Sequence, residues 1–150
     1  MTNKITESTL RTHIERRSNW KLIDQPRSNG ENGVDAVASF QSTLFLIEVI
    51  GYKRTGSARS KDFFEVFWRA ISRLDMSVDS QCTTHNAHDV KLVIALPSEF
   101  LRGMNQRTRH YTAAWKRIAD AFPELEVWFV DEAGFNRYSW LQVLQLEGSF

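Results

Sequence analysis

The stretch of sequence that decides the fold reads Thr43-Leu44-Phe45-Leu46-Ile47-Glu48-Val49-Ile50. A short, continuous apolar run of this kind is typical of a strand that is buried on both faces of a sheet. Glu48 interrupts the run. An ionised carboxylate in such a strand has lost its water, and a metal ion, a cation or hydrogen bonds must replace that water. Glu48 is therefore the first candidate for a functional residue.

A second acid, Asp35, lies in the preceding strand-like segment, residues 33–40. Only Gln41-Ser42 separates the two segments, so we expect them to form neighbouring strands. Their carboxylates could then point at one gap of the size of a magnesium ion.

Each acid also has a structural interpretation. Asp35 could accept backbone hydrogen bonds near a turn. Glu48 could form a buried ion pair with Arg69 or Arg73 of the helix that follows. The two acids together are stronger evidence for a functional site than either alone.

The bulk properties of the chain fit one domain, residues 1–150. The charge is nearly balanced, with 19 basic and 18 acidic residues, so composition alone does not indicate a nucleic-acid-binding protein. The single cysteine, Cys82, excludes an intramolecular disulfide framework. The chain starts without the apolar core of a signal peptide, and it contains no apolar run long enough for a membrane span. We expect a soluble, cytoplasmic protein without a membrane contact.

Periodicity and turn signals divide the chain into alternating elements. Helices are expected over residues 6–18, 61–74, 99–104 and 108–121, with Ser60 as a cap of the second. Strands are expected over residues 20–24, 33–40, 43–50, 90–97 and 125–130. The tail 138–144 is amphipathic by either period and fits a short helix or a strand.

This order of elements predicts an α/β fold with a mixed central sheet of about five strands. Short turns join the early strands, which should form an antiparallel meander. Helical connections follow the third and fourth strands, and they imply parallel crossovers. Helices should cover both faces of the sheet.

One short motif joins the two acids and the following helix. It consists of Gly33-Val34-Asp35 and, thirteen positions later, Glu48 within Leu46-Ile47-Glu48-Val49-Ile50-Gly51-Tyr52. In motif and layout the sequence resembles the PD-(D/E)XK nuclease superfamily, which has the restriction-endonuclease-like fold. The resemblance covers most of residues 6–131.

The resemblance implies that Asp35 and Glu48 bind one or two divalent ions, usually Mg²⁺ (or Mn²⁺). It implies a further ligand in the backbone carbonyl of Val49 and, in some members, an acid from the first helix. Glu7 is a better candidate for this acid than Glu15, although a solvated helix acid is the simpler interpretation of both. A divalent ion held by hard oxygen ligands generates hydroxide near neutral pH and stabilises the extra charge on a phosphate. The implied activity is hydrolysis of phosphodiester bonds.

The sequence departs from the family motif at one position. The family carries a lysine two residues after the second acid, and this position is Ile50, which cannot transfer protons. Residues 48 and 50 of a strand face the same side, so a lysine at 50 would reach the metal. Lys53, turned inward by a bulge at Gly51, or Lys61 could replace it. Otherwise the chain is a degenerate scaffold, or a substitution has disabled it.

A basic loop follows the second acid and offers a surface for a phosphate backbone. Tyr52, Lys53, Arg54 and Arg59 would form this positive lip, although a solvated loop is an equally good interpretation. Two further groups favour simpler explanations. The cluster Cys82, His85, His88 and Asp89 lacks the spacing of a zinc site. The aromatic side chains Phe63, Phe64, Phe67 and Trp68 fit core packing better than base stacking.

The sequence thus supports two hypotheses of different classes. The first is a small Mg²⁺-dependent nuclease-like domain that acts on DNA rather than RNA, with homodimerisation left open. The second is a non-catalytic domain of the same fold that binds nucleic acid or a protein, with structural acids. A fold alone does not fix the chemistry.

Overall fold

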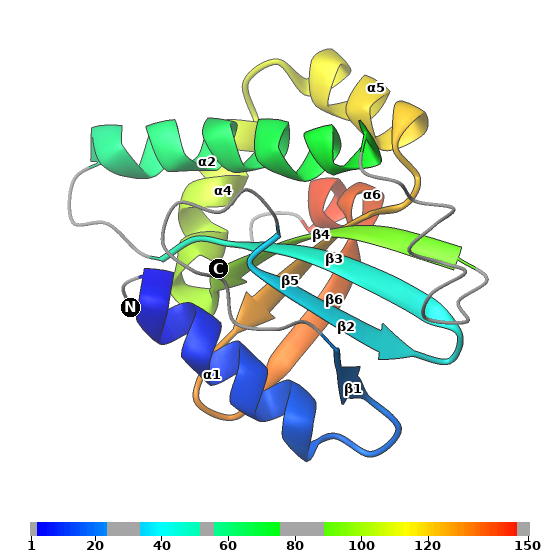
Figure 1. The fold of residues 1–150 in the computed structure, drawn as a ribbon. Coiled ribbons are helices and arrows are strands. Elements are labelled where there is room, and N and C mark those ends of the chain that lie inside the picture. The colour runs from blue at the N-terminus through cyan, green and yellow to red at the C-terminus, as the bar shows by residue number, and fades with distance from the viewer. Residues whose placement is uncertain (1–2, 24–33, 52–55, 76–88, 147–150) are drawn as a thin grey trace.

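A mixed sheet of six strands forms the centre of the molecule, and helices cover both of its faces (Figure 1). The computed structural model describes residues 3–23, 34–51, 56–75 and 89–146. The strands are β1 (Lys21–Leu22), β2 (Ala36–Phe40), β3 (Thr43–Val49), β4 (Asp89–Pro97), β5 (Leu125–Val130) and β6 (Phe135–Ser139). They lie side by side in the order of the sequence.

The directions of the strands follow from their connections. β2 is antiparallel to both of its neighbours, β1 and β3, whereas β3, β4 and β5 are parallel to one another. The expected meander followed by parallel crossovers is confirmed, and so is the α/β class. The number of strands differs from the expected five because β6 adds an antiparallel edge strand to β5.

The helices divide unequally between the two faces. They are α1 (Asn3–Arg16), α2 (Gly56–Ser72), α4 (Leu101–Thr108), α5 (Thr112–Ala121) and α6 (Trp140–Gln145), with short 3₁₀ segments η1 (Arg73–Asp75) and η2 (Ser98–Phe100). Leu10 and Ile14 of α1 pack on one face of the sheet. Side chains of α2, α4, α5 and α6 pack on the other.

The apolar run of β3 supplies both cores. Leu44, Leu46 and Ile50 belong to the core under α2, whereas Phe45 and Ile47 belong to the core under α1. Every residue from 44 to 50 is buried. The continuous apolar pattern reflects this double burial, as expected for a strand between parallel and antiparallel neighbours.

The hairpin between β2 and β3 uses a tight turn with an unusual sequence. Phe40 pairs with Thr43, so the turn consists of Gln41 and Ser42 alone. Both have left-handed backbones, with φ of 50° and 64°. Two consecutive positive φ angles define the type I′ geometry that matches the twist of a hairpin, and Asn-Gly is its preferred sequence.

Several helix boundaries differ from the expected ones. α2 begins at Gly56, so Ser60 lies inside the helix and is not its cap. The hydroxyl of Ser60 instead accepts hydrogen bonds from Nε and Nη2 of Arg107 at 3.1 and 2.9 Å. The third expected helix extends to Thr108, and a left-handed residue, Tyr111, separates it from α5.

The expectation that the large aromatic side chains of α2 are core residues is wrong for two of the four. Phe63 is fully buried and Phe67 nearly so, but Phe64 is 50% exposed and Trp68 is 72% exposed. Phe64 stacks on Trp115 of α5, with ring centroids 6.1 Å apart. α2 therefore has an outer stripe that is apolar although it faces solvent.

The ambiguous tail contains both kinds of structure. Tyr138 and Ser139 end β6, and α6 follows directly. Ser139 forms a capping box with Gln142, because each side chain binds the backbone N–H of the other residue. As for the membrane, no helix in the described part of the chain combines the length and the apolar character that a span requires.

Candidate functional site

Asp35 and Glu48 lie at the point where β2 begins and β3 ends. The amide of Asp35 donates to the carbonyl of Ile47 at 3.0 Å, and Ala36 is also paired with Ile47. Two residues of one strand opposite one residue of the next are the arrangement of a β-bulge, which redirects a side chain. The irregular backbone at Asp35 thus decides where its carboxylate points.

The carboxylate of Asp35 lies beside the backbone of Glu48. Its Oδ2 accepts a hydrogen bond from the amide of Val49 at 2.8 Å, and this nitrogen is bonded to the carbonyl carbon of Glu48. The carbonyl of Val49 points to the same side of β3 as its N–H, toward Asp35. The strand end therefore brings together two carboxylates and one backbone carbonyl.

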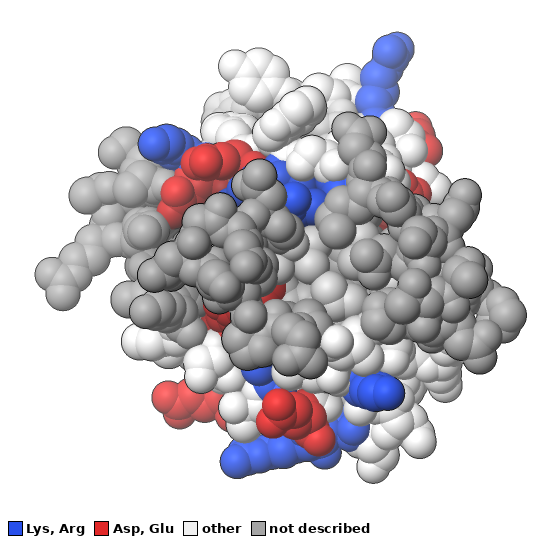
Figure 2. All heavy atoms as spheres, viewed as in Figure 1, with Lys and Arg blue, Asp and Glu red and all other residues white. Residues whose placement is uncertain are grey.

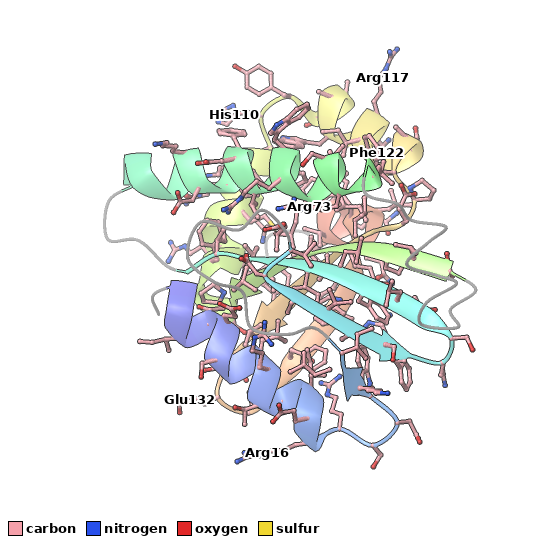
Figure 3. All side chains as sticks on the ribbon, in the orientation of Figure 1. Arg16, Arg73, His110, Arg117, Phe122 and Glu132 are labelled. Atoms are coloured by element: carbon pink, nitrogen blue, oxygen red, sulfur yellow. The ribbon has the colours of Figure 1, made fainter. Side chains whose placement is uncertain are left out.

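The side chain of Glu48 is 2% exposed and faces α2. Nε of Arg73, in η1 directly after α2, donates to its Oε1 at 2.6 Å. Figure 3 shows Arg73 beneath α2, between the helix and the sheet. This hydrogen bond involves one of the two carboxylate oxygens of Glu48. The ion pair that the sequence offered as the alternative for Glu48 is therefore formed, with Arg73 rather than Arg69.

The surroundings raise the pKa of Glu48 to about 7. Burial is the largest cause, because it disfavours the charged form, and the negative charge of Asp35 is the second. The hydrogen bond and charge of Arg73, and the charge of Arg69, act in the opposite direction. The charge of Asp35 therefore acts on Glu48, and the two arginines do not fully offset burial and this charge.

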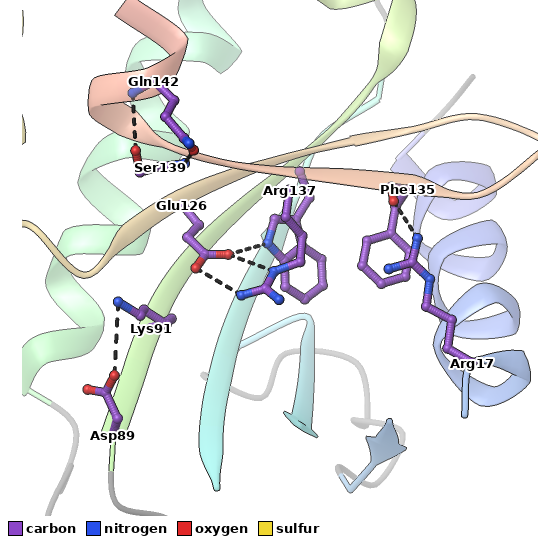
Figure 4. A network of polar contacts seen from close by, with 9 residues as sticks. Arg17, Asp89, Lys91, Glu126, Phe135, Arg137, Ser139 and Gln142 are labelled. Carbon is purple, nitrogen blue, oxygen red and sulfur yellow. Dashed lines mark hydrogen bonds and ion pairs between the residues drawn. The ribbon is translucent and has the colours of Figure 1, made fainter. Parts of the chain in front are cut away.

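A second buried acid provides a comparison (Figure 4). Nε and Nη2 of Arg137 donate to the two oxygens of Glu126 at 3.0 and 3.1 Å, and Trp128 donates to Oε1 at 2.9 Å. The guanidinium also lies over the ring of Phe45, 4.8 Å from its centroid. Glu126 is thus bound at both oxygens, as a structural ion pair requires, whereas Glu48 is bound at one.

Ile50, at the position of the family lysine, is fully buried among the side chains under α2. It faces the same side of β3 as Glu48, as expected from the strand period. Lys61 lies in the exposed stripe of α2 with Phe64 and Trp68. It precedes Arg73 by twelve residues, or about 18 Å of helix. Lys61 and the acid pair are thus on different sides of α2.

The remaining predicted residues lie apart from the two acids or outside the described residues. Glu7 binds Nη2 of Arg11 at 3.3 Å, and the same nitrogen donates to the carbonyl of Asp35 at 2.6 Å. The guanidinium of Arg11 therefore lies between the carboxylate of Glu7 and the backbone carbonyl of Asp35. The sequence gave no reason to expect this arrangement. Of the proposed basic lip, Tyr52, Lys53 and Arg54 lie outside the described residues, and of Arg59 only the helical backbone is described.

The charges on the face seen in Figure 2 are mixed. Acidic and basic side chains are interspersed among the coloured residues, and no broad area carries one sign. This pattern agrees with the net charge of +1. The described part of this face therefore does not itself form an extended basic surface.

The donor set at the strand ends fits magnesium. Mg²⁺ retains several waters and is commonly held by one or two carboxylates. Asp35, Glu48 and the carbonyl of Val49 offer oxygen ligands only. Within the same residues there is no group of three or more His, Cys, Asp or Glu side chains suited to a metal. The set thus fits an ion with two protein carboxylates and a share of water ligands.

A hollow lies at the ends of β4 and β5. It is lined by Pro97, Ser98, Glu99, Val130, Asp131, Glu132 and Ala133. The carboxylate of Asp131 accepts from the amides of Ala133 and Gly134 at 2.8 and 3.1 Å, and from Ser98 at 3.3 Å. These bonds fix the turn before β6. Asp131 therefore has a structural explanation.

Comparison of the chain with protein-family models, with curated proteins and with solved structures gives no match. The functional assignment therefore rests on the chain's own residues and their geometry.

Proposed function

We propose that the chain is a divalent-metal-dependent nuclease-like domain with the restriction-endonuclease-like fold, which hydrolyses phosphodiester bonds in DNA. The observation that carries the proposal is the carboxylate of Asp35 at the Glu48–Val49 peptide, where its charge raises the pKa of the buried Glu48. The order of helix, three antiparallel strands, helix and parallel strand agrees with the proposed fold.

The energetics of the acid pair support a metal-binding role. Of the two carboxylates, Glu48 is disfavoured in its charged form by burial and by the charge of Asp35, which destabilises the folded protein when Glu48 is ionised. A divalent ion between them removes this penalty, because it replaces the lost water and the missing positive charge. Glu126 shows that this protein can bury an acid with complete pairing. The incomplete pairing of Glu48 therefore favours a ligand.

The roles of the residues follow from their positions. Asp35, Glu48 and the carbonyl of Val49 would hold Mg²⁺ or Mn²⁺. The bound ion supplies a water of lowered pKa and positive charge beside the phosphate. Ile50 offers neither charge nor a proton, so we expect slow hydrolysis. Lys53 is the lysine closest in sequence to the acids that could replace it.

Isothermal titration with Mg²⁺ and Mn²⁺ tests the metal site. We expect binding by the unchanged protein and its loss in Asp35→Asn and Glu48→Ala, because each variant removes a charged oxygen ligand. Glu126→Gln is the matched control, since it alters a buried acid of the other core and should leave the affinity unchanged. Absence of divalent binding to the unchanged protein at millimolar concentrations contradicts the proposal.

Cleavage of plasmid and single-stranded DNA tests the catalytic part. The variant Ile50→Lys should cut faster than the unchanged chain, by about 10²–10⁴-fold if the lysine assists proton transfer. Ile50→Met is the control, because it keeps an apolar side chain of similar volume. Circular dichroism must show that the lysine variant is folded, since Ile50 is fully buried. A folded, metal-binding lysine variant without cleavage argues that more than the lysine is missing.

A second candidate is a non-catalytic domain of the same fold. The hydrogen bond from Arg73 to Glu48 and the burial of Ile50 favour it. If the pair is purely structural, replacing both partners in Glu48→Leu/Arg73→Met should be neutral or stabilising, and divalent ions should not protect the unchanged protein against thermal unfolding. Thermal protection by Mg²⁺ that disappears in Glu48→Gln excludes this candidate.

A further inference from the structure

The arginine that binds Glu48 occupies the place of a cation in the candidate site. We propose that Arg73 neutralises Glu48 while no divalent ion is bound, releases it when one binds, and then contacts the phosphate of the substrate together with Arg69. This inference rests on the proposed function. In this inference, Arg69 of α2 and Arg73 of η1 supply the positive charge that a lysine at position 50 supplies in the family.

The first argument is the position of the guanidinium. Nε of Arg73 is 2.6 Å from Oε1 of Glu48, so the guanidinium lies directly against the carboxylate proposed as a metal ligand. Two cations beside the same buried carboxylate repel each other strongly where little water screens them. Arg73 and a divalent ion are therefore competitors for Glu48.

The second argument is the difference in exposure between the partners. The side chain of Glu48 is 2% exposed, whereas that of Arg73 is 20% exposed. Arg73 thus extends from the buried carboxylate to a less buried position beneath α2 (Figure 3). A guanidinium that leaves Glu48 can turn toward solvent without crossing the core.

The third argument is the second arginine. Arg69 precedes Arg73 by four residues, so both lie on the same side of the helical segment. Nε of Arg69 is buried and has no hydrogen-bond partner in the described part of the chain. A buried donor without a partner is costly, and a phosphate oxygen is a suitable acceptor for it. The two guanidinium groups can bind one phosphate through several donors.

The chemistry also limits the role of these arginines. A guanidinium stays protonated at any pH at which the protein folds, so Arg73 and Arg69 can stabilise negative charge but cannot accept the proton of the attacking water. They therefore replace the charge of the missing lysine and not its proton transfer. Charge stabilisation without proton transfer agrees with the slow hydrolysis expected for the chain.

The test follows the Nε–H resonance of Arg73 by ¹⁵N NMR during titration with Mg²⁺. We expect this resonance to shift and its exchange with water to accelerate as Mg²⁺ binds. Arg137 is the internal control, because its bidentate pair with Glu126 should not respond. The resonance is assigned with Arg73→Lys, which keeps the charge and removes Nε.

The outcomes separate the two proposals. Binding of Mg²⁺ with an unchanged Arg73 resonance overturns this inference alone. Absence of Mg²⁺ binding overturns the proposed function and, with it, this inference. Release of Arg73 that depends on Asp35 and Glu48 supports both.

A second measurement tests the phosphate contact. With Ca²⁺ or Mg²⁺ bound, the affinity for inorganic phosphate and for a short oligonucleotide should fall about tenfold or more in Arg73→Gln and in Arg69→Gln, as expected for a lost charged hydrogen bond. Arg73→Gln should also bind Mg²⁺ more tightly, because a competing cation is gone. Unchanged phosphate affinity in both variants, with Arg137→Gln as the control, overturns the contact. If Arg73→Gln does not fold, Arg73→Lys and Arg69→Gln decide the matter.

Discussion

At the scale of single residues, Glu48 links stability to function. Its carboxylate is buried, bound at one oxygen by Arg73, and influenced by the charge of Asp35. Burial and the charge of Asp35 therefore raise the pKa of Glu48 to about 7, against the effect of the arginines. The sequence predicted the two acids and the alternative ion pair, because a charge in an apolar strand must have a partner. It did not decide between Arg69 and Arg73, since that choice depends on how α2 lies on the sheet.

The raised pKa of Glu48 predicts a pH dependence of stability. The folded value is about 7 and the ordinary value 4.5, so the folded state binds more protons than the unfolded state between these values. The contribution of Glu48 is fully present below pH 4.5 and is lost as the pH rises through 7. In urea denaturation with EDTA, we expect the unchanged protein to lose a few kcal/mol more than Glu48→Gln between about pH 5 and pH 8. Equal losses in the two proteins contradict this linkage.

At the scale of elements, the hairpin turn carries backbone strain. Gln41 and Ser42 both have positive φ, which costs roughly 1–2 kcal/mol for a residue with a Cβ atom. Replacing them in Gln41→Asn/Ser42→Gly should raise the free energy of unfolding by about 1 kcal/mol, because Asn-Gly suits the type I′ turn. Ser42→Val should lower it, since β-branched residues oppose this conformation. Chemical denaturation measures both variants, and equal stabilities contradict the assigned turn.

The two sides of α2 should respond differently to truncation. Phe63 is fully buried, so Phe63→Ala should cost about 3–5 kcal/mol. Trp68 is 72% exposed, so Trp68→Ala should change stability by less than about 0.5 kcal/mol. Thermal and urea denaturation of the pair provide the comparison. A large loss of stability in Trp68→Ala would mean that the ring of Trp68 is covered in solution.

The same helix shows a limit of sequence interpretation. Apolar residues surround α2 on most sides, and counting them predicts a buried helix. The structure leaves Phe64 and Trp68 outside, where α5 covers only part of the surface through the stack of Phe64 on Trp115. The extent of this cover depends on how α5 packs, which local periodicity does not contain.

At the scale of the whole molecule, the sheet topology was predictable because connection length fixes strand direction. A two-residue turn joins the antiparallel strands β2 and β3, and connections that contain helices join the parallel strands. β6 was missed because it is a polar edge strand, in which Phe135 is buried and Asn136 and Arg137 are exposed. The proximity of Asp35 and Glu48 followed from the hairpin. The hydrogen bond from the amide of Val49 to the carboxylate of Asp35 could not be predicted, since it arises from an irregular backbone at Asp35.

The two strands at the edges of the described sheet have a consequence for behaviour at high concentration. β1, at one margin, is two residues long and includes the exposed Lys21. β6, at the other, exposes Arg137 and Asn136. Short strands with charged side chains make poor templates for another chain. We therefore expect the folded protein to resist strand-by-strand aggregation, so that concentrated samples for the NMR titrations should stay in solution.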